Sequence, residues 1–279
     1  YDNHGLEAAV KRDEVDFVIT NPGSYIGLEA AYGVTRILTL KALNLGKPYT
    51  AFGSVIFTRA ERSTIQGLED LKGKSFMAVD PEAFGGFLMG WLVYKEMGID
   101  PFRDFAGLRF EGLPQDRIVY AVQRGEADAG IVRTGLLEQL ARQGRIRLSD
   151  FRILNPQQVS GFPFALSTRL YPEWPFARAR HTPEDLAQKV ASALLALPEN
   201  SPAARASESA GWTVPLDYTP VHELYKTLRV GPYRDYGKIT LAEVFRLYWY
   251  WLLIFLTALM LLGGVSVYIL RLNRGLKQS

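Results

Sequence analysis

Three short segments carry residue types that could bind a small anion. They are TNPGSY at residues 20–25, FGGF at residues 84–87 and VRT at residues 132–134. The first offers backbone N–H groups and small hydroxyls where a strand turns into a helix. The second has two glycines that let the backbone approach a ligand closely, followed by the positive end of a helix. The third ends a strand with the guanidinium of Arg133, which can fork onto an oxyanion, so together the segments predict an anion-binding cleft.

The elements that position these segments alternate between strand and helix patterns. Such alternation predicts parallel sheets with crossover helices, and folds of this kind bind ligands at the carboxyl ends of strands. The predicted strands are residues 15–20, 35–40, 54–58, 75–79, 107–110, 129–132, 151–154 and 164–167. One predicted helix starts at residue 25, one lies around 66–71, one runs to about 97, and two cover 114–124 and 135–143. The last predicted helix is capped by Thr182, with Pro183 at its first position and Asp185 as its capping-box acid.

The alternation is interrupted near residues 47–58 and 161–167, which we interpret as two crossings between lobes. A lobe inserted into another lobe through two extended connections predicts a hinged clamp with its ligand between the lobes. The predicted domains are lobe 1, first part (1–52), lobe 2 (53–160), the return segment of lobe 1 (161–230), a membrane-proximal linker (231–246), a transmembrane helix (247–270) and a cytoplasmic stub (271–279).

Motifs for catalysis and for metal binding fail on inspection. GLEDLKGKS at residues 67–75 resembles a phosphate-cradling loop, but five residues separate its first two glycines, one too many, and a helix precedes it where a strand is required. In GSYIG at residues 23–27 the serine directly follows the glycine, unlike a nucleophile elbow. The histidines His4, His181 and His222 lack paired ligand spacing. We therefore expect no catalytic residue, metal or other cofactor; the enzyme alternative would need a titratable pair in the cleft.

Composition excludes further function classes. Cysteine is absent, which excludes disulfides, thiolate catalysis and cysteine-ligated metals. The formal net charge is +3, but acidic and basic residues are interleaved, as in KRDE at residues 11–14, so we expect no nucleic-acid partner. Asp128 is the most suggestive carboxylate, and it could either cap a turn or contact a ligand.

The uncharged run at residues 247–270 predicts one transmembrane helix. As a helix it would extend roughly 36 Å, against a hydrocarbon core of about 30 Å, and aromatic residues stand near both ends. Arg271, Arg274 and Lys277 follow it, so the positive-inside tendency places the C-terminus in the cytoplasm and the preceding body outside the cytoplasmic (inner) membrane. The alternative is a core helix of a soluble protein. Because an exported body needs a signal and the chain begins with Tyr1, we expect it to begin inside a longer protein.

Five stretches carry a resemblance to a known family. They are VDFVITNPGSY (15–25), LEDLKGKSFMAVDPEAFGGF (68–87), GEADAGIVRTGLLEQLA (125–141), STRLYPEWPFA (167–177) and GWTVPLDYTPVHELYKTLRVGPY (211–233). The sequence resembles the PhnD-like (phosphate/phosphonate-binding-protein-like) branch of type II periplasmic binding domains. The last two stretches point to the sensor domains of membrane histidine kinases of the tetrathionate-sensor type. The resemblance implies an α/β, two-lobed type II periplasmic-binding-protein fold followed by one transmembrane helix.

The resemblance also implies a set of ligand contacts. They are Asn21, Ser24, Tyr25, Ser54, Phe84, Gly85, Gly86, Arg133 and Thr134. Tyr25 and Phe84 would pack against the less polar atoms of the ligand. Domains of this family begin with a strand–helix–strand unit, so we expect lobe 1 to be incomplete at its N-terminus and to lack some contacts. Ala83 and Phe84 stand where transport-type relatives carry hydroxyl residues, which weighs against a phosphonate ligand.

The combined interpretation is the extracytoplasmic sensor domain of a two-component receptor. It would bind a small oxyanion, with a sulfur oxyanion such as tetrathionate favoured, and signal through the transmembrane helix. The resemblance implies a parent histidine kinase that works as a homodimer with a response regulator downstream. One alternative is a membrane-anchored substrate-binding component of a phosphonate or oxyanion ABC transporter, and another is a nonfunctional gene fragment. The sequence beyond Ser279 would separate the sensor from the transporter component.

Overall fold

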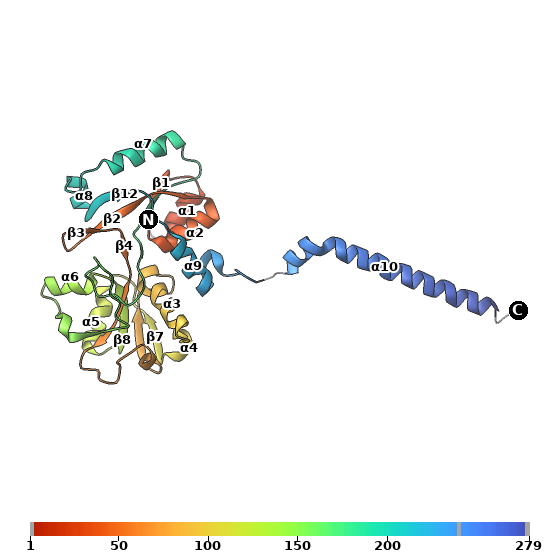
Figure 1. Cartoon of the computed structure of the whole chain (residues 1–279), viewed down its shortest axis with the longest axis horizontal. Helices are drawn as coiled ribbons and strands as arrows, with labels where there is room; N and C mark the ends of the chain where they lie inside the picture. The colour runs from red at the N-terminus through yellow and green to blue at the C-terminus, as the bar shows by residue number, and fades with distance from the viewer. Residues whose placement is uncertain (1–2, 239–240, 277–279) are drawn as a thin grey trace. The chain divides into compact units, whose positions relative to one another are not determined.

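The computed structural model describes residues 3–238 and 241–276, and the chain divides into two compact units, residues 1–234 and 235–279. The first unit contains two five-stranded sheets, each the centre of one lobe, and a two-stranded ladder. Figure 1 shows helices packed around each lobe. Tyr1, Lys277 and Ser279 lie outside the described residues.

Lobe 1 is built on a sheet in the order β1-β11-β2-β12, with β3 paired to β2. Every pair in this sheet is antiparallel, and β11, which returns from lobe 2, lies between β1 and β2. The parallel pairing predicted from the alternation is therefore wrong for lobe 1. Its elements are α1 (Asn3–Lys11), β1 (Phe17–Ile19), α2 (Pro22–Tyr32), β2 (Thr35–Asn44), β3 (Lys47–Tyr49), β11 (Pro175–Arg178), α7 (Glu184–Leu195), α8 (Pro202–Ala206), β12 (Ser209–Thr213), α9 (Thr219–Leu228) and the 3-10 helix η4 (Gly231–Tyr233).

Lobe 2 is built on a sheet in the order β7-β6-β8-β5-β9. Strand β6 pairs in parallel with β7 and β8, as predicted, whereas β5 is antiparallel to β8 and β9. The carboxyl ends of β6, β7 and β8 therefore lie at one edge of the sheet. The elements are β5 (Ser54–Arg59), η1 (Glu69–Leu71), β6 (Ser75–Ala78), the π-helical turn η2 (Phe84–Leu88), α3 (Met89–Glu96), α4 (Pro101–Asp104), β7 (Gly107–Phe110), α5 (Asp116–Arg124), β8 (Ala129–Arg133), α6 (Leu136–Arg142), η3 (Leu148–Asp150) and β9 (Phe151–Leu154).

The chain crosses between the lobes twice, at the short antiparallel pair β4 (Ala51–Phe52) and β10 (Tyr171–Pro172). The strand predicted at residues 164–167 is absent. This segment keeps one backbone contact with β5, from the Ser167 N–H to the Ser54 carbonyl at 2.9 Å, and the Ser167 hydroxyl adds two more: Oγ accepts a hydrogen bond from the Ile56 N–H at 2.8 Å and donates one to the Leu154 carbonyl at 2.7 Å. The side chain thus bridges the end of the paired strands β5 and β9, where Ile56 lies opposite Leu154.

Two helix starts differ from their predictions. Helix α2 begins at Pro22 instead of residue 25, because the Asn21 side chain accepts a hydrogen bond from the Ser24 N–H at 3.0 Å and proline suits the first helical position. Helix α7 has no side-chain cap. The predicted cap, Thr182, instead donates its hydroxyl to the Asp16 carbonyl at 2.7 Å, which ties the helix start to the sheet.

The side chains of Asp70 and Asp128 accept hydrogen bonds from backbone N–H groups. The helix predicted around residues 66–71 is reduced to the single turn η1, because the Asp70 carboxylate accepts the N–H groups of Gln66 and Gly67 at 2.8 and 3.0 Å. This side chain competes with helical hydrogen bonding.

Asp128 accepts both the N–H and the hydroxyl of Ser75 at 2.9 Å. It is not among the residues of the grooves described below, so it serves the sheet.

The second unit contains helix α10 (Leu241–Leu276), which has 36 residues. Within it, Phe245–Arg271 is long and apolar enough to cross a membrane, and none of this 27-residue segment is buried in the protein. The predicted transmembrane run at 247–270 falls inside that segment. The helix extends the run in both directions, since it starts within the predicted linker and continues into the predicted stub.

Candidate functional site

A groove of about 820 Å³ lies between the two lobes, and we call it the interlobe groove. Lobe 1 lines it with the end of β2, the turn before β3 and the segment from α8 to β12. Lobe 2 contributes the end of β8 and helix α6. The crossing strand β4, the aromatic residues Phe162 and Phe164 and the residues after β10 line the groove as well. A groove of this size suits a small molecule. Its polar side chains are Asn44, Arg133, Thr134, Gln139, Arg142, Gln143, Glu173, Arg205, Ser207 and Glu208.

Arg133, the predicted oxyanion ligand, lines this groove and pairs with the carboxylate of Glu173. Its guanidinium also lies over the ring of Phe52, with Cζ 4.1 Å from the ring centroid. The Glu173 side chain is 2% exposed, against 31% for Arg133. Burial raises the pKa of Glu173, while the positive charge of Arg133 opposes that shift. The protein therefore offsets much of the charge of Arg133 before any ligand binds.

Thr134 joins the first crossing to lobe 2, and Ser54 lies within lobe 2 at the start of β5. The Thr134 N–H donates to the Gly53 carbonyl, and Thr134 Oγ1 accepts the Gly53 N–H, both at 3.1 Å. Ser54 is completely buried, and its hydroxyl donates to the Gly85 carbonyl at 2.6 Å. Thr134 also lines the interlobe groove, whereas Ser54 does not. Their assignment as ligand contacts stays a prediction.

The glycines at 85 and 86 have a packing reason that is independent of a ligand. A Cβ added at Gly86 would lie 2.4 Å from Val79 Cγ2, and one at Gly85 would lie 3.0 Å from the Phe52 ring. Phe84 is 2% exposed and packs against the rings of Phe52, Tyr171 and Tyr225, with centroids 6.1, 5.2 and 6.3 Å away. Phe84 thus fills the junction of the lobes, and a ligand could reach it only after the lobes open.

The segment around Asn21 faces a different hollow. Gly23 and Ser24 line a second groove of about 490 Å³, together with residues of α3, α9 and η4. Asn21 caps helix α2 through the Ser24 N–H, and its amide also donates to the Ser24 hydroxyl at 2.8 Å. The three predicted segments therefore do not converge on one cavity: Arg133 and Thr134 line the interlobe groove, Ser24 lines the second groove, and residues 84–86 line neither.

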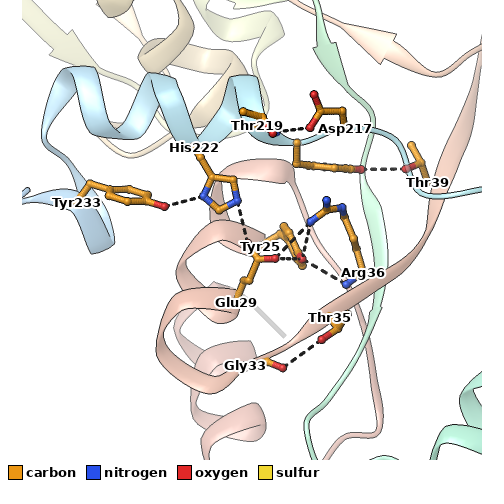
Figure 2. A network of polar contacts seen from close by, with 11 residues as sticks. Tyr25, Glu29, Gly33, Thr35, Arg36, Thr39, Asp217, Thr219, His222 and Tyr233 are labelled. Atoms are coloured by element: carbon orange, nitrogen blue, oxygen red, sulfur yellow. Dashed lines mark hydrogen bonds and ion pairs between the residues drawn. The ribbon is translucent and has the colours of Figure 1, made fainter.

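Tyr25 is completely buried and belongs to a polar network inside lobe 1 (Figure 2). Its hydroxyl donates to Glu29 Oε1 at 2.6 Å and accepts the backbone N–H of Arg36 at 3.3 Å. Burial, and then the hydrogen bond to Glu29, raise the pKa of Tyr25 to about 12. The Arg36 guanidinium lies 3.3 Å from Glu29 Oε1 and 5.2 Å from the ring centroid of Tyr218. Tyr25 therefore holds α2 to β2.

The same network reaches the end of the first unit through His222 of α9 (Figure 2). His222 Nδ1 lies 2.8 Å from the hydroxyl of Tyr233 in η4, and His222 Nε2 lies 2.9 Å from Glu29 Oε2. The second contact is an ion pair when the imidazole is protonated, and its direction does not suit a hydrogen bond. Helices α2, α9 and η4 are thus tied together next to the point where the first unit ends.

Sequence reasoning missed Glu173 and the His222 network. Glu173 does leave a signal, because it is one acid inside the apolar stretch YPEWPF at residues 171–176. A buried charge of this kind needs a partner. The partners of His222 lie in α2 and η4, and local spacing does not indicate the contact with Glu29, which is 193 residues away in the chain (222 minus 29).

Comparison with known families decides the class of this groove-bearing unit. Residues 1–220 match the profile of the family described as "ABC transporter, phosphonate, periplasmic substrate-binding protein". The chain belongs to this family. The matched region includes lobe 2, both crossings and lobe 1 as far as the start of α9, so the family resemblance predicted from the sequence is confirmed.

A sensor protein is among the relatives of this phosphonate-binding-type domain. The tetrathionate sensor histidine kinase TtrS of Salmonella typhimurium (strain LT2) is 36% identical over 232 residues, which are 83% of this chain and 38% of that relative. The chain thus spans 38% of the length of this relative. This similarity links the domain to a membrane sensor kinase.

Two solved binding proteins share the fold. PhnD1 from Prochlorococcus marinus (MIT 9301), in complex with methylphosphonate, superposes with a TM-score of 0.61 at 16% identity and covers 82% of this chain and 84% of that chain. A binding protein component of an ABC phosphonate transporter from Pseudomonas aeruginosa has a TM-score of 0.60 at 16% identity and covers 87% and 78%. The predicted type II periplasmic-binding-protein fold is confirmed.

Proposed function

We propose that this chain is the extracytoplasmic ligand-binding domain of a membrane sensor and that it binds a small oxyanion in the interlobe groove. The observation that carries the proposal is the arginine-lined groove between two lobes, in a domain 36% identical to a sensor kinase. The proposal assigns binding to this chain and no catalysis.

The ligand would act by changing how the lobes are arranged. A ligand shifts such an equilibrium only as far as its affinity for the two arrangements differs. Contacts from both walls of the interlobe groove would form together only when the lobes are close. Binding would therefore stabilise a closed arrangement. Tyr25, inside lobe 1, and Phe84, at the junction of the lobes, are both buried in the present arrangement.

Helix α9 offers a route from lobe 2 to the end of the first unit. Lys95 Nζ of α3 in lobe 2 donates to the Thr227 carbonyl of α9 in lobe 1 at 2.6 Å. Arg169, at the second crossing, pairs with Glu96 of α3 at 2.7 Å. Because α9 leads through η4 into the segment before α10, a movement of α3 would reach that segment through α9. We propose that α10 spans the cytoplasmic membrane, with the C-terminus in the cytoplasm.

The sensor proposal brings partners with it. In the whole protein we propose a homodimer formed through the membrane and cytoplasmic parts, with a response regulator as the downstream partner. The relative's name makes tetrathionate the favoured ligand. The second candidate is an anchored substrate-binding component of an ABC transporter for phosphonates or other oxyanions. The family description favours this candidate.

Ligand-dependent thermal stabilisation tests the proposed function. The full chain in detergent would be heated with tetrathionate, thiosulfate, phosphate or methylphosphonate, because a ligand that binds only the folded state must raise the midpoint. We expect saturable stabilisation by a sulfur oxyanion. Stabilisation by methylphosphonate alone would favour the transporter component. No shift with any of the four anions would contradict an oxyanion groove.

A further inference from the structure

We infer that the interlobe groove selects an elongated dianion, with one charge held by Arg142 of lobe 2 and the other by Arg205 of lobe 1. The inference rests on the proposed function and names the ligand class and the cations of that site. It gives Arg133 a different role from the one that its position at the end of β8 predicted. Arg142 and Arg205 line the groove together with Arg133.

Arg133 is poorly placed to receive the charge of a ligand. Its guanidinium already has the Glu173 carboxylate as partner and covers the ring of Phe52. An anion that took Arg133 away would leave Glu173, a side chain 2% exposed, without its cation. Uncompensated burial of a carboxylate is costly, so this exchange works against binding. Arg133 instead holds the wall of the groove in place.

Arg142 has no such constraint. Among the residues that the structure describes, its side chain has no hydrogen bond or ion pair, and it is exposed at the last turn of α6. Gln139 and Gln143 line the groove beside it, one turn of helix away or adjacent. Gln139 lies three residues before Arg142 and four before Gln143, and these spacings bring the side chain of Gln139 close to each of them. Two amides and one guanidinium thus give lobe 2 a wall of hydrogen-bond donors, which suits an oxyanion.

Arg205 lies on the opposite wall. It belongs to helix α8 of lobe 1, it is exposed, and in the described part of the chain its side chain has no polar partner either. The groove therefore has one uncompensated guanidinium in each lobe. A compact tetrahedral anion is much smaller than a groove of about 820 Å³, whereas an elongated anion charged at both ends can engage both walls. Such a ligand would hold the lobes together.

One acid opposes this arrangement. Glu208 lines the lobe 1 wall near Arg205, so the groove charges outside the Arg133–Glu173 pair are two arginines and one glutamate, a net of +1 (two minus one). A carboxylate here weakens binding of every anion. Removing its charge should therefore strengthen binding, which is the opposite sign from removal of either arginine.

Titration calorimetry on the full chain in detergent tests the inference. Tetrathionate, an elongated dianion, and thiosulfate, a compact one, are titrated into the wild type and into Arg142→Gln, Arg205→Gln and Glu208→Gln. Arg117→Gln is the matched control, because Arg117 is also exposed in lobe 2 and does not line the groove. Midpoints of unfolding without ligand show that each variant is folded.

We expect tetrathionate to bind more tightly than thiosulfate. Each arginine substitution should weaken tetrathionate binding by about 10-fold to 100-fold, the loss of one charged hydrogen bond. Glu208→Gln should strengthen it, and Arg117→Gln should leave it unchanged. Tight tetrathionate binding that survives Arg142→Gln or Arg205→Gln would overturn the inference and leave the proposed function standing. A wild type that binds neither anion would contradict both.

Discussion

The guanidinium of Arg133 pairs with the carboxylate of Glu173, and this contact joins the end of β8 in lobe 2 to the second crossing between the lobes. The hydroxyl of Tyr218 donates to the Glu173 carbonyl, which links the same residue to lobe 1. Glu173 therefore stands between the groove and the network of Figure 2. A displacement of Arg133 would therefore change contacts in both lobes.

Substitution of Arg133 should destabilise the fold even in the absence of ligand. Arg133→Gln leaves the buried Glu173 carboxylate without its cation, which should lower the free energy of unfolding by about 1–3 kcal/mol. Urea unfolding of the full chain measures this loss. Arg133→Gln combined with Glu173→Gln should recover part of it. Equal stability of the wild type and Arg133→Gln would show that the pair does not compensate Glu173.

The pKa of Glu173 predicts a pH dependence of stability. Burial raises this pKa above its ordinary value of 4.5, so the folded state binds the proton more tightly than the unfolded state does. The contribution of Glu173 to stability is then fully present below pH 4.5 and is lost as pH rises through the folded-state pKa. Wild type should therefore lose stability relative to Glu173→Gln as pH rises from 4.5. Unfolding at a series of pH values tests this, and a gap that stays constant would contradict it.

The Ser167 hydroxyl should be important for the second crossing. Ser167→Ala leaves the Ile56 N–H and one Leu154 carbonyl interaction unsatisfied inside lobe 2. We expect a loss of about 1–3 kcal/mol in the free energy of unfolding. Ser63→Ala, at an exposed position of the same lobe, is the matched control and should change little. Equal effects of the two substitutions would remove the special role of Ser167.

The fold was largely predictable because strand and helix patterns are local. The strands at 107–110 and 151–154 have the predicted bounds, and the family resemblance supplied the two-lobed class. The antiparallel order of lobe 1 was not predictable, because it depends on where β11 inserts after a long excursion through lobe 2. The segment at 164–167 was not predictable for a similar reason, since its contacts with β5 and β9 include those of the Ser167 hydroxyl, whose partners lie far away in the sequence.

Gly86 separates packing from ligand approach. Gly86→Ala places a Cβ 2.4 Å from Val79 Cγ2 and should cost about 1–3 kcal/mol of stability without any ligand. Gly67→Ala is the control, because a Cβ at Gly67 meets no atom within 4 Å. Both variants would be compared by thermal unfolding. Full stability of Gly86→Ala together with weaker anion binding would instead favour the ligand-approach role predicted from the sequence.

The contact between His222 and Tyr233 should hold η4 against lobe 1. Tyr233→Phe removes the hydroxyl that lies 2.8 Å from His222 Nδ1. Amide hydrogen exchange in Gly231–Tyr233 should become faster, while exchange in β5 of lobe 2 stays the same. Tyr120→Phe is the comparison variant, since Tyr120 lies in α5 of lobe 2 and its hydroxyl has no hydrogen-bond partner among the described residues. Unchanged exchange in η4 would argue against this attachment as part of the signal route.

The candidate site shows where sequence patterns stop being informative. The position of Arg133 at a strand end was read correctly, and the residue does line the groove. Its partner Glu173 lies 40 residues away in the sequence, beyond the second crossing, so the sequence did not indicate that the charge of Arg133 is compensated. The glycines at 85 and 86 looked like a ligand loop, but the structure shows a packing reason for each. Ligand contacts of the nine predicted residues stay a prediction.

Closure of the two lobes on an oxyanion is the central claim, and a distance measurement tests it most directly. The chain contains no cysteine, so a double variant can carry only two spin labels, one at Lys189→Cys in lobe 1 and one at Arg147→Cys in lobe 2. Both side chains are exposed. Pulsed electron paramagnetic resonance of the full chain would be recorded without and with saturating tetrathionate. We predict a shift to shorter distances on binding. Binding shown by calorimetry with an unchanged distance distribution would contradict the account.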